Sequence, residues 1–176
     1  MSVLHPGSTD AIPSTREGVV AGLLGAAVVA IFYFGVDLAR GLPLLTPSVL
    51  GEVLVFHRPE VPLDTVNSAA VAVYTGVHLL LFLAFGLVLT ALATRAETSS
   101  VARYAVLQLF IVFELFFFGL LAIASETTRG LFPLWSVLTA NTVAALVMGT
   151  WIWRHHPKLR RAMGRTPLGA PEMQVE

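Results

Sequence analysis

Four long apolar stretches constrain the fold of this chain more than any other feature of its sequence. They lie near residues 18–39, 66–93, 101–124 and 131–153. A run of about 18 or more mostly apolar residues is long enough for a helix to cross a bilayer. We therefore expect an all-α membrane protein, built as a bundle of four transmembrane helices.

Little of the chain remains outside these stretches. Of its 176 residues, 56% are hydrophobic and 12% are charged, whereas about one-quarter are charged in a typical soluble domain. We expect residues 18–153 to form one membrane domain. Residues 1–17 should be a disordered N-terminal tail, and residues 154–176 a basic, then disordered, C-terminal tail. We therefore expect no soluble catalytic or ligand-binding domain in the residues that are left.

The composition also excludes several kinds of site and partner. The chain has no cysteine, so disulfides and thiolate metal sites are excluded. Its formal net charge is +0, which gives no reason to expect a nucleic-acid partner. Residues 1–15 lack the basic region of a signal peptide, so we expect the first apolar helix to be retained as a span.

The distribution of basic residues predicts the orientation of the bundle, because Lys and Arg concentrate in cytoplasmic loops. Four spans place both termini on one side, and that side collects most of the basic residues: Arg16, Arg95, Arg103, Arg154, Lys158, Arg160, Arg161 and Arg165. The other side holds Arg40, Arg58 and Arg129. We expect a multi-pass protein of a bacterial-type inner (plasma) membrane, with both termini in the cytoplasm.

The segment between the first two spans carries a helical pattern of its own. Thr46 followed by Pro47 is typical of an N-cap and a first helical position. Apolar residues then recur at helical spacing as far as Phe56. Because roughly ten residues are too few to span a bilayer, we expect a short helix on the outer surface between spans 1 and 2.

A stripe of small residues runs along the first span. Its members are four residues apart: Gly18, Gly22, Ala26 and Ala30. This spacing places them on one helix face and lets a second backbone approach closely. The favoured interpretation is a packing contact inside the bundle, and the alternative is a homodimer interface. On the last span, we expect Asn141, Ala145 and Gly149 to form a similar series.

Polar residues interrupt three of the spans at matching depth, namely His78, Glu114 and Asn141, and Tyr74 shares the helix face of His78. His78 and Glu114 each lie about 18 residues from the turn that joins their helices, near the middle of the bilayer. An unpaired carboxylate there costs several kcal/mol. Matching depth does not fix which way the side chains face. A proton relay and a purely interhelical contact therefore both stay open.

We expect no metal, no cofactor and no catalytic activity. His78 and Glu114 supply two ligands, whereas a catalytic zinc site usually has three protein ligands. His155 and His156 lie roughly 20 Å away by the helix rise, too far to complete such a site. The sequence has no Ser–His–acid arrangement, Gly-rich phosphate loop or zinc-protease motif.

The basic residues after the last span form a juxtamembrane cluster: Arg154, Lys158, Arg160 and Arg161. Each would attract anionic lipid headgroups by about 1 kcal/mol. The simpler interpretation is that the cluster only sets the topology.

These patterns favour a non-catalytic accessory subunit or assembly component of a membrane complex. Its expected partners are the lipid bilayer and another membrane protein or a second copy of the chain. The alternative is a small oligomeric transporter or proton-linked channel that uses His78 and Glu114. Transport ranks second because four helices enclose little lumen and the sequence shows no inverted repeats with broken helices.

Overall fold

The computed structural model describes residues 15–58, 60–123 and 132–165, and every regular element in these ranges is helical. The elements are α1 (Thr15–Ala39), α2 (Leu45–Leu50), the π-helix η1 (Gly51–Val55), α3 (Ser68–Ala96), α4 (Ser100–Ile123), α6 (Leu134–His155) and α7 (Pro157–Arg165). Four of them, α1, α3, α4 and α6, contain stretches long and apolar enough to cross a membrane. The predicted all-α fold with four long apolar helices is therefore confirmed.

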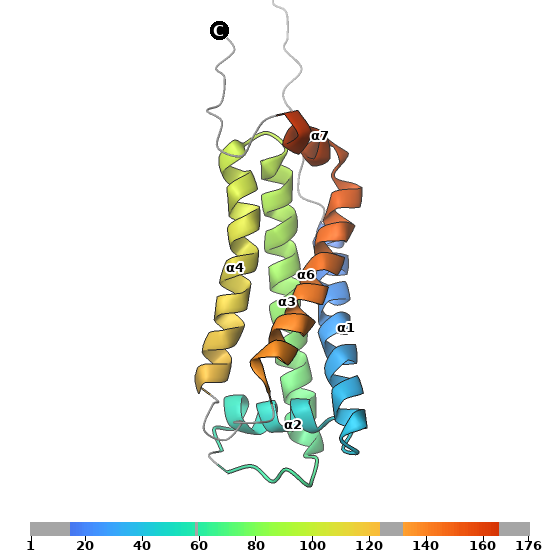
Figure 1. Ribbon diagram of the computed structural model, residues 1–176, viewed down its shortest axis with the longest axis vertical. Helices are drawn as coiled ribbons and strands as arrows, with labels where there is room; N and C mark the ends of the chain where they lie inside the picture. The colour runs from blue at the N-terminus through green and yellow to red at the C-terminus, as the bar shows by residue number, and fades with distance from the viewer. Residues whose placement is uncertain (1–14, 59, 124–131, 166–176) are drawn as a thin grey trace, which may run out of the picture.

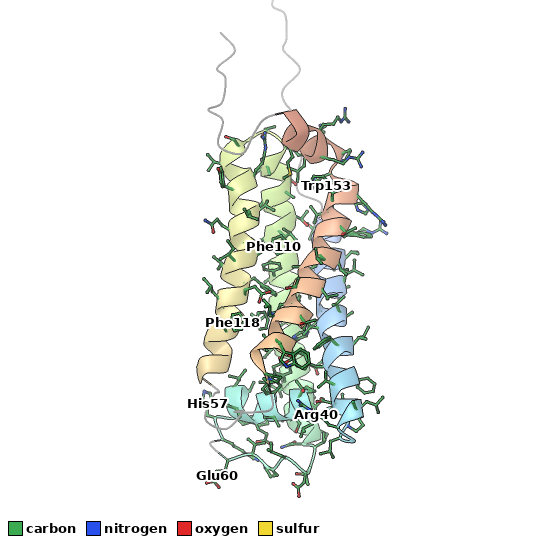
Figure 2. All side chains as sticks on the ribbon, viewed as in Figure 1. Arg40, His57, Glu60, Phe110, Phe118 and Trp153 are labelled. Carbon is green, nitrogen blue, oxygen red and sulfur yellow. The ribbon has the colours of Figure 1, made fainter. Side chains whose placement is uncertain are left out.

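The four long helices run along the long axis of the molecule, and two short elements lie at its ends (Figure 1). α2 lies across one end, which we call the α2 end, and α7 lies at the other, the α7 end. Together α2 and η1 form the predicted short helix between the first two spans. Most of the basic residues of the described chain lie in α7 or near the helix ends that surround it. Arg40 and His57 lie at the α2 end (Figure 2).

Several predicted boundaries need correction. α1 begins at Thr15, so residues 15–17 of the expected disordered tail are helical. α7 adds a helix over residues 157–165, where we expected only a basic and then disordered tail. α3 begins later than expected, because the Asn67 side chain caps it by accepting hydrogen bonds from the N–H groups of Ala69 at 3.0 Å and Ala70 at 3.3 Å.

Glycines permit a close helix contact between α1 and α3. A Cβ atom added to Gly22 would lie 2.5 Å from the Phe82 carbonyl oxygen. One added to Gly86 would lie 2.5 Å from the Gly22 nitrogen and 2.8 Å from the Gly22 Cα. Only residues without a side chain permit this approach. The small-residue stripe is therefore an intramolecular contact at Gly18, Gly22 and the buried Ala26, whereas Ala30 is exposed.

Aromatic rings join α3 to α4. The rings of Phe85 and Phe113 lie 4.1 Å apart, and those of Phe82 and Phe113 lie 5.4 Å apart in an edge-to-face arrangement. Phe117 extends the cluster, with its ring 4.8 Å from that of Phe113. Such ring pairs add about 0.5–1.5 kcal/mol each to the burial of apolar area. Phe82 is fully buried and belongs to the hydrophobic core of the bundle.

The last long helix, α6, packs through a face next to the one that we predicted. Its buried residues are Ser136, Val137, Ala140, Asn141, Ala144, Met148 and Ile152. Of the predicted series, Asn141 is buried, but Ala145 and Gly149 are only partly covered, and a Cβ added to Gly149 would meet nothing within 4 Å. Ala145 and Gly149 instead line a groove beside α6.

Candidate functional site

Glu114 and Asn141 form a polar pair between α4 and α6. The Asn141 side-chain amide donates a hydrogen bond of 3.3 Å to Glu114 Oε2. Asn141 is 2% exposed, whereas Glu114 is partly exposed. In the described part of the chain, Asn141 is the only hydrogen-bond partner of Glu114. The carboxyl group is therefore incompletely covered by its own protein.

The partly exposed side of Glu114 faces a groove that we call the α4–α6 groove. Its volume is about 630 Å³. α4 forms one wall, which includes Phe110, and α6 forms the other, which includes Trp153 (Figure 2). Leu89 of α3 also lines the groove, as do Leu159 and Met163 of α7. The groove is almost entirely apolar, and Glu114 is the only ionisable side chain among its described lining residues.

The structure places His78 and Tyr74 away from this pair. The Nε2 atom of His78 lies 3.2 Å from the carbonyl oxygen of Ala26 on α1. The Tyr74 ring stacks on the His78 ring at 5.9 Å. No hydrogen bond or ion pair between His78 and Glu114 occurs among the described residues.

A phenylalanine lies between the two groups. The ring of Phe82 lies 4.7 Å from His78 on one side and contacts Phe113 and Phe117 of α4 on the other. The predicted polar layer of His78, Glu114 and Asn141 is thus divided: Glu114 pairs with Asn141, and His78 lies with Tyr74 on the other side of Phe82. The rotation of α3, which turns His78 toward α1, is the reason.

At the α2 end, a buried carboxylate anchors α2, a feature that we did not predict. Asp37 of α1 is fully buried, and both of its side-chain oxygens accept 2.7 Å hydrogen bonds from Thr46, one from the backbone N–H and one from the hydroxyl. We expected Thr46 to cap the helix itself, but α2 starts at Leu45 and Asp37 supplies the capping oxygen from another helix. The sequence feature that could have indicated this contact is the position of Asp37, an acidic residue near the end of an apolar helix.

A second buried carboxylate ties the loop after η1 to α3. Glu52 is 3% exposed and forms an ion pair of 3.0 Å with Arg58. It also accepts a hydrogen bond from the side-chain amide of Asn67, the residue that caps α3. The backbone N–H of Asn67 donates to Ser48 Oγ at 2.9 Å. These contacts connect α2, η1 and the start of α3 through one cluster of polar side chains at the α2 end.

At the α7 end, His156 joins three parts of the chain. It lies between α6 and α7 and is 7% exposed. Its Nδ1 atom hydrogen-bonds Glu97 Oε1 at 2.7 Å, and its Nε2 atom lies 3.1 Å from Glu17 Oε1 in an ion-pair contact without hydrogen-bond geometry. Sequence spacing gave no sign of this arrangement.

The predicted headgroup-binding residues lie at the same end. Arg154, Lys158, Arg160 and Arg161 are all exposed. The last three belong to α7, whose Leu159 is 5% exposed and packs into the bundle core. α7 is thus amphipathic, with a buried apolar side and a basic outer side.

Within residues 15–58, 60–123 and 132–165, no three His, Asp or Glu side chains are grouped so that they could hold a metal ion. Comparison of the chain with protein-family models, curated proteins and solved structures finds no match.

Proposed function

We propose that this chain is a non-catalytic integral membrane protein that serves as an accessory subunit or assembly component of a membrane complex. In this proposal α1, α3, α4 and α6 span a plasma membrane, and the α7 end lies in the cytoplasm. A transmembrane helix of the partner lies along the α4–α6 groove and offers a hydrogen-bond donor to Glu114.

The incomplete covering of Glu114 carries this proposal. By the helix rise, the residue lies about 20 Å from Ser100 and about 13 Å from Ile123, well inside a hydrocarbon layer about 30 Å thick. A carboxyl group at that depth is costly unless it is paired. Asn141 provides one hydrogen bond, and the rest of the group faces the groove. A partner helix would complete its surroundings.

The features of the groove indicate what kind of helix would fit. Its walls are apolar, and Gly149 and Ala145 leave space along α6. Small residues on a partner would permit close approach, and a Ser, Thr, Asn, Gln or His side chain would supply the donor. The transporter alternative has less support, because Phe82 lies between His78 and the α4 helix that carries Glu114.

Purification of the tagged protein in mild detergent, followed by mass spectrometry, tests the proposal. We expect one membrane protein to copurify in stoichiometric amount. Glu114→Leu should reduce its recovery about threefold or more, since one hydrogen bond inside a membrane protein averages about 0.6 kcal/mol. Gln108→Ala, an exposed position on the same helix, is the matched control and should not change recovery.

Two results would count against the proposal. If the Glu114→Leu variant recovers as much of the partner as the wild-type protein does, the partner does not bind in the groove. Purification as a homo-oligomer without any other protein would favour the transporter alternative.

A further inference from the structure

A second cavity lies between α1 and α3 near the α2 end, and different residues line it from those of the α4–α6 groove. We call it the α1–α3 cavity, and its volume is about 360 Å³. Thr46 and Pro47, both in α2, line the cavity at that end. Ile31 and Phe34 also line it and are 71% and 46% exposed. If α1 and α3 span a bilayer, this exposed side faces the lipid tails.

Most polar groups on the cavity wall already have partners. Asp37 accepts two hydrogen bonds from Thr46, and the Tyr33 hydroxyl lies 3.4 Å from Ser136 Oγ. Tyr74 differs, because its hydroxyl has no hydrogen-bond partner among the described residues. A hydroxyl in an apolar environment without a hydrogen bond costs free energy. A polar atom of a bound molecule would remove that cost.

His78 supplies a second polar group on the same wall. Its Nε2 atom lies 3.2 Å from the Ala26 carbonyl oxygen, and since a carbonyl only accepts, Nε2 carries the proton. The Nδ1 atom of the neutral ring is then an acceptor. No Lys or Arg occurs among the described residues that line the cavity. The α1–α3 cavity can therefore form hydrogen bonds with a neutral group. Its described lining residues provide no cation that would bind a phosphate or a fatty-acid carboxylate.

We propose that the α1–α3 cavity binds the neutral, oxygen-bearing ring of a lipid-soluble quinone or quinol, whose tail extends into the bilayer. Tyr33, Phe34, Tyr74 and His78 provide aromatic surfaces for a flat ring. The volume is near the lower end of the range for small-molecule sites, about 300–1,000 Å³, which suits a ring and the start of a tail. The Tyr74 hydroxyl pairs with a ring oxygen.

Thermal unfolding of the purified protein in detergent, titrated with decylubiquinone, tests this site. A ligand that binds the folded state raises the unfolding temperature as its concentration rises. We expect this rise with decylubiquinone and not with decane, which matches its tail alone. Tyr74→Phe removes only the hydroxyl and should weaken binding about two- to twelvefold, the equivalent of one neutral hydrogen bond. Tyr104→Phe, exposed on α4, is the matched control.

A second variant keeps the test decisive if Tyr74→Phe unfolds. Ala30 lines the cavity and is exposed, so Ala30→Phe should fold and block the site. Loss of the decylubiquinone effect in this variant supports the proposal. An equal effect of decane, or unchanged binding by both variants, would show that the cavity takes acyl chains without selecting a ring.

Discussion

At the scale of single residues, glycines allow the backbones of α1 and α3 to approach each other closely. Gly86 was not among the small residues that we singled out, yet it lies against Gly18 and Gly22. The stripe on α1 alone favoured a contact inside the bundle but left a contact with a second copy of the chain as the alternative. Its partner glycine on α3 makes the contact intramolecular, because two backbones that lack side chains there can approach closely.

Gly86→Ala should therefore destabilise the bundle. Its Cβ would meet the backbone of Gly22, which cannot move aside as a flexible side chain would. We expect a loss of about 1–3 kcal/mol, typical of overpacking, measured as a lower unfolding temperature in detergent. Gly76→Ala in the same helix is the control, because its Cβ would meet nothing within 4 Å. Equal stability of the two variants would contradict the close contact.

At the scale of elements, α2 is held by a side chain from α1. Asp37→Ala leaves the N–H and hydroxyl of Thr46 without their acceptor. We expect a local cost of about 1–3 kcal/mol and hydrogen exchange of the α2 amides that is roughly 5- to 150-fold faster. Asp64→Ala, exposed in the loop before α3, should leave this exchange unchanged. Unchanged exchange after Asp37→Ala would show that packing alone holds α2.

α7 depends in a similar way on His156. His156→Ala removes the contacts to Glu97 and Glu17 and leaves the two carboxyl groups without the imidazole between them. Hydrogen bonds to charged groups contribute about 1.5–3 kcal/mol, so α7 should exchange faster and the protein should unfold at a lower temperature. His155→Ala, at the neighbouring exposed histidine, is the control and should change neither the exchange of α7 nor the unfolding temperature. If it has the same effect, the role that we assign to His156 is wrong.

The sequence predicts elements here better than it predicts contacts. Length and apolarity are local properties, so all four long helices and the segment over residues 45–55 could be predicted to within a few residues. Helix rotation is not local. Depth alone suggested Glu114, Asn141 and His78 as one layer, but close packing against α1 turns His78 toward Ala26. The contact of His156 with Glu97 joins residues 59 positions apart, which no spacing reveals.

At the scale of the whole molecule, the described chain starts and finishes at one end. The contact of Glu17 with His156 brings the start of α1 to the start of α7. This agrees with an even number of long helices, and the basic residues gather at the same end. The orientation of that end toward the cytoplasm remains a prediction from the distribution of charge.

Cysteine labelling tests the orientation, because the chain has no cysteine of its own. We introduce single cysteines at the exposed positions Glu60, on the α2 side, and Thr98, between α3 and α4. An impermeant thiol reagent should label Glu60→Cys in intact cells and label Thr98→Cys only after the membrane is opened. The reverse pattern would overturn the assigned orientation.

The most direct test of our account is photocrosslinking from the α4–α6 groove in living cells. A photoreactive amino acid at Ile111, which lines the groove and is 50% exposed, should give one discrete product with a membrane protein. Adding Glu114→Leu should reduce that product. The same probe at Leu80, which is 67% exposed on α3, should give none. Identical products from both positions, or no product from Ile111, would contradict a partner in the groove.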